Sequence, residues 1–370
     1  MRTLVISDLH LGSRRPVDIL RRPEPLDALC SGLGGIDRLV LLGDVLELRQ
    51  GPAREALSAA QPVLEAIGAA LPQHAEVVIT AGNHDYALVS PWLAGRGLRE
   101  EFEPLGLAQP APTATSPIAQ AMKEWLGDGR SVSLSYPGVW LRDDVWATHG
   151  HYLDRLITIP TFERIAAGGM ARVVGRLPEP GEGSADPDEF EAALAPMYAW
   201  LDQLANGRAA GGRWAAGAAT AKAWSLLSAD GRAPLRGKAL AALLPLGIAG
   251  INLAGLGPVR SKIDSDELRR AGVAAMAGVV KLLGVEAGYV IFGHTHCAGP
   301  LPWMDPGDWV APGGTQLINT GCWTDEPHID MNNPRNPYRP GYAVLVEDEG
   351  PPRLVRITEN LGLRRGSHGD

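Results

Sequence analysis

Residues 289–296 read YVIFGHTH, and this stretch decides how the rest of the chain is interpreted. The apolar run 289–292 predicts a short buried strand that ends at Gly293. His294 and His296 follow on the turn that leaves the strand, so that their imidazoles can point at one spot. Such a pair alone does not define a site. It gains weight because four other predicted strand ends carry ligands of the same kind.

The first part of the chain repeats this arrangement three times. Apolar runs at 3–7, 38–42 and 76–80 predict strands, and the apolar spacing at 57–71 predicts a helix. Strands joined by crossovers pair in parallel, and open α/β sheets place their sites at the carboxyl ends of such strands. The residues at these three ends are Asp8 and His10, then Asp44, then Asn83, His84 and Asp85.

The middle of the chain holds two more strands and then a long helical stretch. Strands are predicted at 131–135 and 145–148, and the second ends at His149, with His151 two positions later. The pattern from about 152 to 283 is helical and rich in alanine and glycine. One helix is expected to start at Asp186, because Asp186 can cap it and Pro187 suits its first turn.

The last part of the chain returns to strands. A helix over 266–283 is expected to stop at Gly284 and to lead into the strand before His294. A strand is expected at 315–319, and a hairpin is expected from 342–346 and 353–357. The expected organisation is a core in two parts around an insert. The ranges are 1–151 for the first core part, 152–284 for the helical insert, 285–360 for the second core part and 361–370 for a disordered tail.

Composition narrows the class of protein. The chain has 370 residues, 45% of them hydrophobic, and a formal net charge of −8. This balance argues against a general nucleic-acid binder, which needs basic surface. A small anionic substrate is compatible with it, because a metal site supplies local positive charge. Three cysteines and no visible leader segment predict a reducing, cytoplasmic location.

The longest window without charged residues, 239–259, lies inside the insert. It is long enough to raise the question of a membrane span, since ~20 apolar residues cross a bilayer. A single crossing would put His149 and His294 on opposite sides of the membrane, where they could not share a site. Two interpretations stay open, a buried helix pair or a lid that contacts a membrane surface or lipid.

The side chains at the five strand ends suit two metal ions. There are three oxygen ligands and four imidazoles, which is too many for one tetrahedral zinc. Such a set suits two divalent ions that share a carboxylate. Mixed nitrogen and oxygen ligands favour Mn²⁺, with Fe, Zn²⁺, Ni²⁺ or Co²⁺ as alternatives. A centre of this kind attracts phosphate. The candidate ligands are Asp8, His10, Asp44, Asn83, His149, His294 and His296.

Taken together, the five turns resemble the five motifs of the calcineurin-like metallophosphoesterase superfamily. The motifs are DLH at 8–10, GD at 43–44, GNHD at 82–85, HGH at 149–151 and GHTH at 293–296. The resemblance covers residues 1–150 and 285–360. It implies an α/β fold, a four-layer αββα sandwich with a two-metal site at one edge. The implied enzyme is a phosphoesterase in which a metal-bridging hydroxide attacks phosphorus in line.

The resemblance also implies a role for each matched residue. His84 resembles the residue that donates to the substrate phosphate or protonates the leaving group, and Asp85 resembles the one that orients it. The remaining matched residues resemble metal ligands. Asp8, His10 and His296 would hold the first ion, Asn83, His149 and His294 would hold the second, and Asp44 would bridge them.

Contacts to the substrate are less defined by the sequence. Arg14 or Arg15 is a candidate to bind the substrate phosphate through its guanidinium. The alternative is that both are solvent-exposed charges of a loop. His151 is a candidate phosphate contact, with a structural role as the alternative. A small-molecule phosphomonoester, phosphodiester or pyrophosphate is the expected substrate.

Within the superfamily, the first two motifs resemble the branch of the UDP-2,3-diacylglucosamine pyrophosphatases. A lipid-linked or nucleotide substrate is therefore one hypothesis. Three features depart from relatives. His84 stands where those enzymes usually have arginine, Glu47 stands where many members of the superfamily have aspartate, and the insert is longer. Two other functions are alternatives, a non-catalytic scaffold that keeps the fold and a DNA repair nuclease of the same fold. Complete metal ligands argue against the scaffold, and the acidic balance argues against the nuclease.

Overall fold

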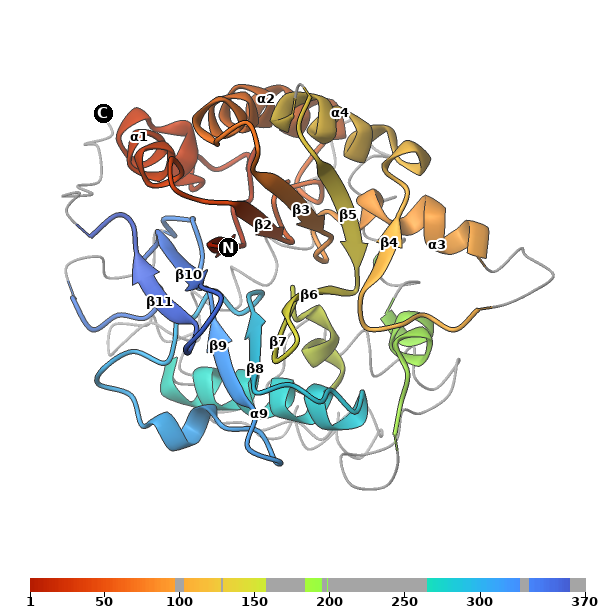
Figure 1. Ribbon diagram of the computed structural model, residues 1–370, viewed down its shortest axis with the longest axis vertical. Helices are drawn as coiled ribbons and strands as arrows, with labels where there is room; N and C mark the ends of the chain where they lie inside the picture. The colour runs from red at the N-terminus through yellow and green to blue at the C-terminus, as the bar shows by residue number, and fades with distance from the viewer. Residues whose placement is uncertain are drawn as a thin grey trace, which may run out of the picture.

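Two β-sheets lie face to face, with helices on their outer faces (Figure 1). Helices α1 (Pro23–Gly32), α2 (Ala53–Ala70) and α4 (Pro117–Leu126) cover one sheet, and α9 (Ser265–Leu282) covers the other. The predicted α/β sandwich with its αββα layers is therefore confirmed. The computed structural model describes residues 1–96, 103–127, 129–157, 184–194, 198, 265–326 and 333–359.

The larger sheet has seven strands in the order β11-β10-β1-β2-β3-β5-β4. Its centre is parallel, because β1 pairs with β2, β2 with β3 and β3 with β5 in that sense. The outer strands β10, β11 and β4 are antiparallel to their neighbours. The strands are β1 (Thr3–Ile6), β2 (Arg38–Leu42), β3 (Glu76–Thr80), β4 (Gln109–Ala111), β5 (Val132–Tyr136), β10 (Tyr342–Val346) and β11 (Arg353–Arg356).

The smaller sheet has the order β6-β7-β8-β9, with β7, β8 and β9 parallel. Residues 289–296 form β8 and the turn after it, and the sheet places them directly beside β7. Chain segments on either side of the insert therefore become neighbours. The sequence did not predict β6, which forms an antiparallel hairpin with β7. The strands are β6 (Gly138–Arg142), β7 (Val145–Thr148), β8 (Tyr289–Phe292) and β9 (Gln316–Asn319).

Both faces of the central strands are buried, which explains their unbroken apolar sequences. Val5, Val40 and Val78 point toward the smaller sheet and pack with residues such as Ile291. The alternate residues, among them Leu39, belong to the core between the larger sheet and its helices. Side chains alternate across a strand, so one run of apolar residues fills two layers.

Helix boundaries follow local chemistry. Asp186 caps the helix that follows it, as expected, because Glu189 N–H donates to Asp186 Oδ1 (2.9 Å). Asp186 N–H donates in turn to Glu189 Oε2 (3.0 Å), which completes a capping box that was not predicted from the sequence. Helix α9 stops before Gly284, whose φ of +61° suits glycine. The remaining helical elements are α3 (Ser90–Arg96), η1 (Ile19–Arg21), η2 (Tyr86–Leu88), η3 (Thr113–Thr115), η4 (His151–Arg155) and η5 (Pro306–Trp309).

Several expectations fall outside the described residues. These include the uncharged window 239–259, the tail 361–370 and the continuation of the helix through Pro196. Within the described ranges, no helix is long and apolar enough to cross a membrane.

Candidate metal centre

The turns after the strands meet at one edge of the two sheets. His10 N–H donates to Asp44 O (2.9 Å), which joins the first two turns. Gly293 N–H donates to His149 O (2.9 Å), which joins the last two. His294 N–H donates to Asp8 Oδ2 (3.0 Å), which ties the end of the smaller sheet to the start of the larger one. The side chains proposed as ligands therefore come from one region.

The backbone at this edge is strained. Among the described residues, five that are not glycine have a positive φ, and all five are predicted metal ligands. This left-handed conformation costs about 1–2 kcal/mol per residue for L-amino acids. Strain of this kind clusters at functional sites, where the surrounding structure enforces it. The residues and angles are Asp8 (56°), His10 (45°), Asp44 (51°), His294 (66°) and His296 (58°).

Two glycines permit the close packing of these turns. A Cβ at Gly82 would collide with Asp44 Oδ1, and a Cβ at Gly293 would collide with Asp8 Oδ2 and Ser7 Oγ. The absence of a side chain therefore lets each turn approach a carboxylate. This is a physical reason for glycine to precede the polar residues in both turns.

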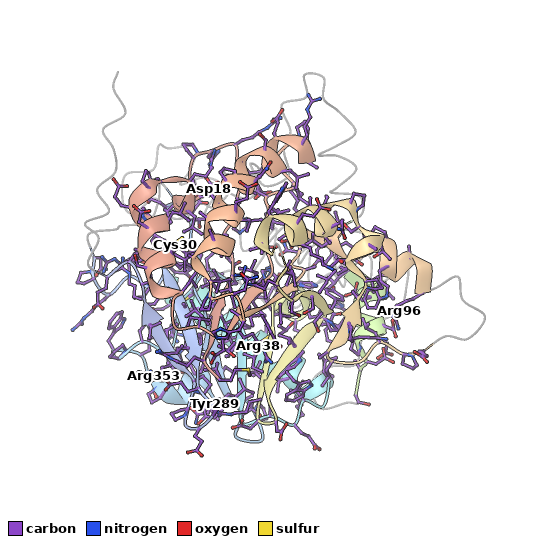
Figure 2. The ribbon with its side chains drawn as sticks, turned by 45° about the horizontal axis from the view of Figure 1, so that its top comes forward. Asp18, Cys30, Arg38, Arg96, Tyr289 and Arg353 are labelled. Atoms are coloured by element: carbon purple, nitrogen blue, oxygen red, sulfur yellow. The ribbon has the colours of Figure 1, made fainter. Side chains whose placement is uncertain are left out.

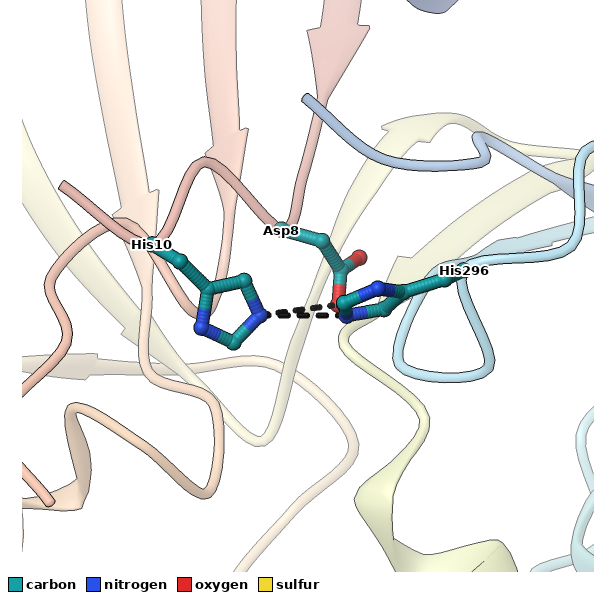
Figure 3. A group of neighbouring side chains, drawn as sticks. All are labelled: Asp8, His10 and His296. Atoms are coloured by element: carbon teal, nitrogen blue, oxygen red, sulfur yellow. Dashed lines mark hydrogen bonds and ion pairs between the residues drawn. The ribbon is translucent and has the colours of Figure 1, made fainter. Parts of the chain in front are cut away.

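Asp8, His10 and His296 form the first group of candidate ligands (Figure 3). His296 Nε2 lies 3.1 Å from His10 Nε2 and 3.3 Å from Asp8 Oδ1. Asp8 Oδ1 is buried and has no hydrogen-bond partner among the described residues. A buried carboxylate oxygen without a donor is costly, and a cation among these three atoms would satisfy it.

Asp44, His149 and His294 form a second group. Asn83 joins it, because one end of its amide lies 3.0 Å from His294 Nδ1, 3.2 Å from Asp44 Oδ2 and 3.2 Å from His149 Nε2. In the orientation of this structure that end is Oδ1, so that an oxygen faces only acceptors. Turning the amide would satisfy the contacts by donation, and a cation would satisfy them without turning it. The residues of both groups therefore fit divalent ions.

Asp44 lies between the two groups. Its Oδ2 is 3.3 Å from His149 Nε2 in the second group and 3.7 Å from His10 Nε2 in the first. Its Oδ1 accepts the backbone N–H of His84 (2.8 Å). One carboxylate oxygen thus faces both groups while the other is held by the backbone.

The outward nitrogens of the imidazoles have partners of their own. His149 Nδ1 lies 2.9 Å from Leu42 O, and His10 Nδ1 lies 3.2 Å from Glu47 Oε2. Each partner accepts a hydrogen bond from that nitrogen, which leaves the other nitrogen of the ring turned toward the cluster. Carboxylate and carbonyl partners orient metal-binding imidazoles in this way.

His294 and His296 are held in the same manner. His294 Nε2 lies 2.7 Å from Asp154 Oδ1, and His296 Nδ1 lies 3.4 Å from Thr324 Oγ1. Asp154 is buried and follows the fourth motif, 140 residues before His294. Sequence reasoning did not assign it a role, and no local pattern marks it.

Replacement of Asp154 by asparagine is expected to weaken Mn²⁺ binding about 10- to 100-fold, because the loss of a carboxylate that orients a metal-binding imidazole has this effect. The measurement is the Mn²⁺ concentration that gives half-maximal hydrolysis, together with direct binding. Asp143→Asn is the control, since Asp143 is exposed. Equal Mn²⁺ affinity in the Asp154→Asn and wild-type proteins would contradict this role.

Electrostatics divide the buried groups into charged and neutral ones. Burial disfavours charge on Asp44, but the positive charges of His149 and His84 outweigh it and hold the pKa of Asp44 well below its usual range. Burial lowers the pKa of His149, but Asp44 outweighs it and raises that pKa to about 9. Burial and the charge of Asp44 raise the pKa of Asp85 to about 6. Asp44 is therefore the firmly charged carboxylate of the pair Asp44 and Asp85.

His84 and Asp85 have different surroundings. His84 Nδ1 lies 2.9 Å from Glu47 Oε2, and the His84 side chain is 23% exposed. Asp85 is fully buried and accepts the backbone N–H groups of Gly82 (2.7 Å) and Val45 (2.8 Å). In this structure the carboxylate that contacts the His84 ring is Glu47, and Asp85 binds the two turns together. From the sequence, Glu47 was noted only because many members of the superfamily have aspartate at this position, and no contact with His84 was predicted.

Of the predicted substrate contacts, His151 lies beside the second group, with its ring centroid 5.7 Å from that of His149, whereas Arg14 and Arg15 are exposed. His151 is buried, with Nε2 3.0 Å from the Tyr136 hydroxyl. Arg14 is exposed and pairs with Glu55 at 3.5 Å, and Arg15 is exposed. Within the described residues, neither arginine has a recorded hydrogen bond or ion pair with a candidate ligand.

A buried acidic residue fixes part of the insert beside His151. Glu191 accepts the hydroxyls of Tyr136 (2.5 Å), Tyr152 (2.6 Å) and Tyr86 (2.8 Å). Hydrogen bonds of this kind offset the cost of burying a carboxyl group. Residues 184–194, which belong to the predicted insert, therefore pack on the core next to the candidate site.

A sandwich with carboxylates and imidazoles gathered at its edge is typical of metal-dependent hydrolases. A family model of the calcineurin-like phosphoesterases matches residues 1–218, and the chain belongs to this family. The match includes four of the five motifs, and the structure places the fifth, at 293–296, against them. The match does not separate branches of the family. A search of curated proteins finds no match.

Proposed function

We propose that the chain hydrolyses a phosphomonoester, phosphodiester or pyrophosphate with the help of two divalent ions. The observation that carries the proposal is the position of Asp44 Oδ2, 3.3 Å from His149 Nε2 and 3.7 Å from His10 Nε2. A carboxylate oxygen between two groups of imidazoles is what a bridging ligand requires. Membership of the calcineurin-like phosphoesterase family supports the same class of reaction.

The proposed ligands form two sets that share Asp44. Mixed nitrogen and oxygen donors favour Mn²⁺, with Fe, Zn²⁺, Ni²⁺ or Co²⁺ as alternatives. When bound, the ions would polarise the phosphoryl oxygens and activate a water molecule near neutral pH. One set is Asp8, His10 and His296, and the other is Asn83, His149 and His294.

His84 is proposed to donate a proton or hydrogen bond to an oxygen of the substrate. Burial opposes charge on Glu47, but His84 and His10 outweigh it and lower the pKa of Glu47 below its usual range. A charged Glu47 accepts a hydrogen bond from His84 Nδ1 and so fixes the orientation of the ring. Nε2 is the nitrogen left for a phosphoryl or leaving-group oxygen.

The insert, 152–284, is proposed to form part of the substrate mouth. Its described residues support this, since Asp154 contacts His294 and Glu191 lies in the tyrosine cluster beside His151. A lipid-linked substrate and contact of the insert with a membrane surface belong to the same proposal.

The test is a substrate panel with the purified chain and Mn²⁺. Hydrolysis of p-nitrophenyl phosphate or bis-p-nitrophenyl phosphate is expected, together with its loss in chelator. A nucleotide diphosphate lipid presented in liposomes tests the lipid-linked substrate, and sedimentation of the chain with the same liposomes tests membrane contact. Absence of hydrolysis across the whole panel, with Mn²⁺ bound, would contradict the proposal and favour a scaffold.

A further inference from the structure

Arg49 is a cation beside the metal centre that has no acidic partner among the described residues. It lies in the loop of the second motif, where its backbone N–H donates to Glu47 Oε1 (2.9 Å). Its Nη2 is shielded from solvent and has no hydrogen-bond partner within the described ranges. Burying a guanidinium nitrogen without an acceptor costs free energy, so a hydrogen-bond acceptor for this nitrogen is expected.

The guanidinium is adjacent to the second group of candidate ligands. Arg49 Nη1 lies 2.8 Å from one end of the Asn83 amide, whose other end faces Asp44, His149 and His294. The width of one amide group therefore separates Arg49 from the proposed metal ligands. With the Asn83 oxygen turned toward the ligands, the amide NH₂ and Arg49 Nη1 are two donors side by side, an arrangement that an oxyanion satisfies.

We propose that Arg49 binds a non-bridging oxygen of the substrate's phosphoryl group, so that the chain prefers a phosphomonoester to a phosphodiester. This inference rests on the proposed phosphoesterase function. A monoester has three non-bridging oxygens and about two negative charges near neutral pH. A diester has two such oxygens and one charge. Two bound ions would neutralise two of these oxygens, which would leave a charged oxygen for Arg49 only in the monoester.

Tyr198, a residue of the insert, lies on the guanidinium, with its ring centroid 5.0 Å from Arg49 Cζ. Arginine often stacks on aromatic rings in this way, which orients its planar fork. Nη2 is shielded from solvent, so an oxyanion would bind it only if a side chain around it moved. The contact with Tyr198 therefore places this residue of the insert beside Arg49, where the substrate is proposed to bind.

Two variants test the inference in the full chain loaded with Mn²⁺. Arg49→Met is expected to bind inorganic phosphate about 10- to 100-fold more weakly, the size of a lost charge-assisted hydrogen bond. Its kcat/KM for p-nitrophenyl phosphate is expected to fall by a similar factor. For bis-p-nitrophenyl phosphate the expected fall is about threefold or less, because the diester has no third charged oxygen. Arg49→Lys keeps the charge, and its phosphate affinity and kcat/KM are expected to lie between those of Arg49→Met and the wild type.

Arg353→Met is the matched control, since Arg353 lies on β11 at the outer edge of the larger sheet and is 57% exposed (Figure 2). Bound Mn²⁺ and the melting temperature are measured for each variant. Unchanged phosphate affinity, or equal losses for the two esters, would overturn the role of Arg49. If Arg49→Met does not fold, the same comparison is made with Arg49→Lys. A wild-type chain that hydrolyses neither ester would overturn the proposed function, while phosphate binding would still test Arg49.

Discussion

The Asp44→Asn protein is expected to hydrolyse p-nitrophenyl phosphate about 10³-fold more slowly than the wild type, or slower still. Asp44 Oδ2 faces both groups of candidate ligands, and the positive charges of His149 and His84 hold the pKa of Asp44 well below its usual range. Replacing it with a neutral amide removes the negative charge of the proposed shared ligand. Loss of about 4 kcal/mol of transition-state stabilisation corresponds to this factor.

Asparagine is the most informative substitution for Asp44. Asp44 has a φ of 51°, and asparagine tolerates this left-handed conformation better than alanine does. A loss of activity therefore reports the charge and not backbone strain. The measurement is kcat at saturating Mn²⁺, with Asp143→Asn as control. A rate within threefold of the wild type would contradict the assignment of Asp44.

His84→Ala is expected to lower kcat about 10²- to 10⁴-fold without lowering the amount of bound Mn²⁺. His84 contacts Glu47 through Nδ1 and is partly exposed, which leaves Nε2 for the substrate. If it protonates the leaving group, the loss is larger for an alkyl phosphate than for p-nitrophenyl phosphate, whose leaving group needs little protonation. If it donates to the phosphoryl group, the losses are similar.

His74→Ala is the control for this variant, because the His74 side chain is 71% exposed. Metal content is measured beside kcat, so that a loss of ions is not read as a loss of proton donation. Wild-type kcat in His84→Ala for both esters would show that His84 takes no part in the reaction.

Much of the fold was predictable because both of its sheets have parallel strands at their centre. Strands buried on both faces have continuous apolar sequences, and β1, β2, β3 and β8 were recognised on that basis. Strand β6 was not recognised; it is buried at Leu141 but only partly buried at Val139 and Trp140, unlike the central strands. Strand β4 has three residues, one of them proline, and lies at an edge.

Candidate ligands that directly follow a strand were predictable from the sequence. Contacts between residues far apart in the chain were not. The structure places Asp8, Asp44 and His294 together, as expected from parallel strand ends. The contact of Asp154 with His294 joins residues that are 140 positions apart in the chain, and no local pattern encodes it. The same holds for Arg49, which lies beside Asn83, whereas Arg14 and Arg15 were singled out only for their nearness in sequence.

We propose that the chain holds two divalent ions at one edge of its two sheets and needs them for hydrolysis. The most direct measurement is a calorimetric titration of the metal-free chain with Mn²⁺, with hydrolysis of p-nitrophenyl phosphate followed in parallel. About two ions per chain and activity that rises with their binding are predicted for the wild type, with fewer ions for Asp44→Asn. Hydrolysis at the same rate in chelator, with no Mn²⁺ bound, would contradict the account.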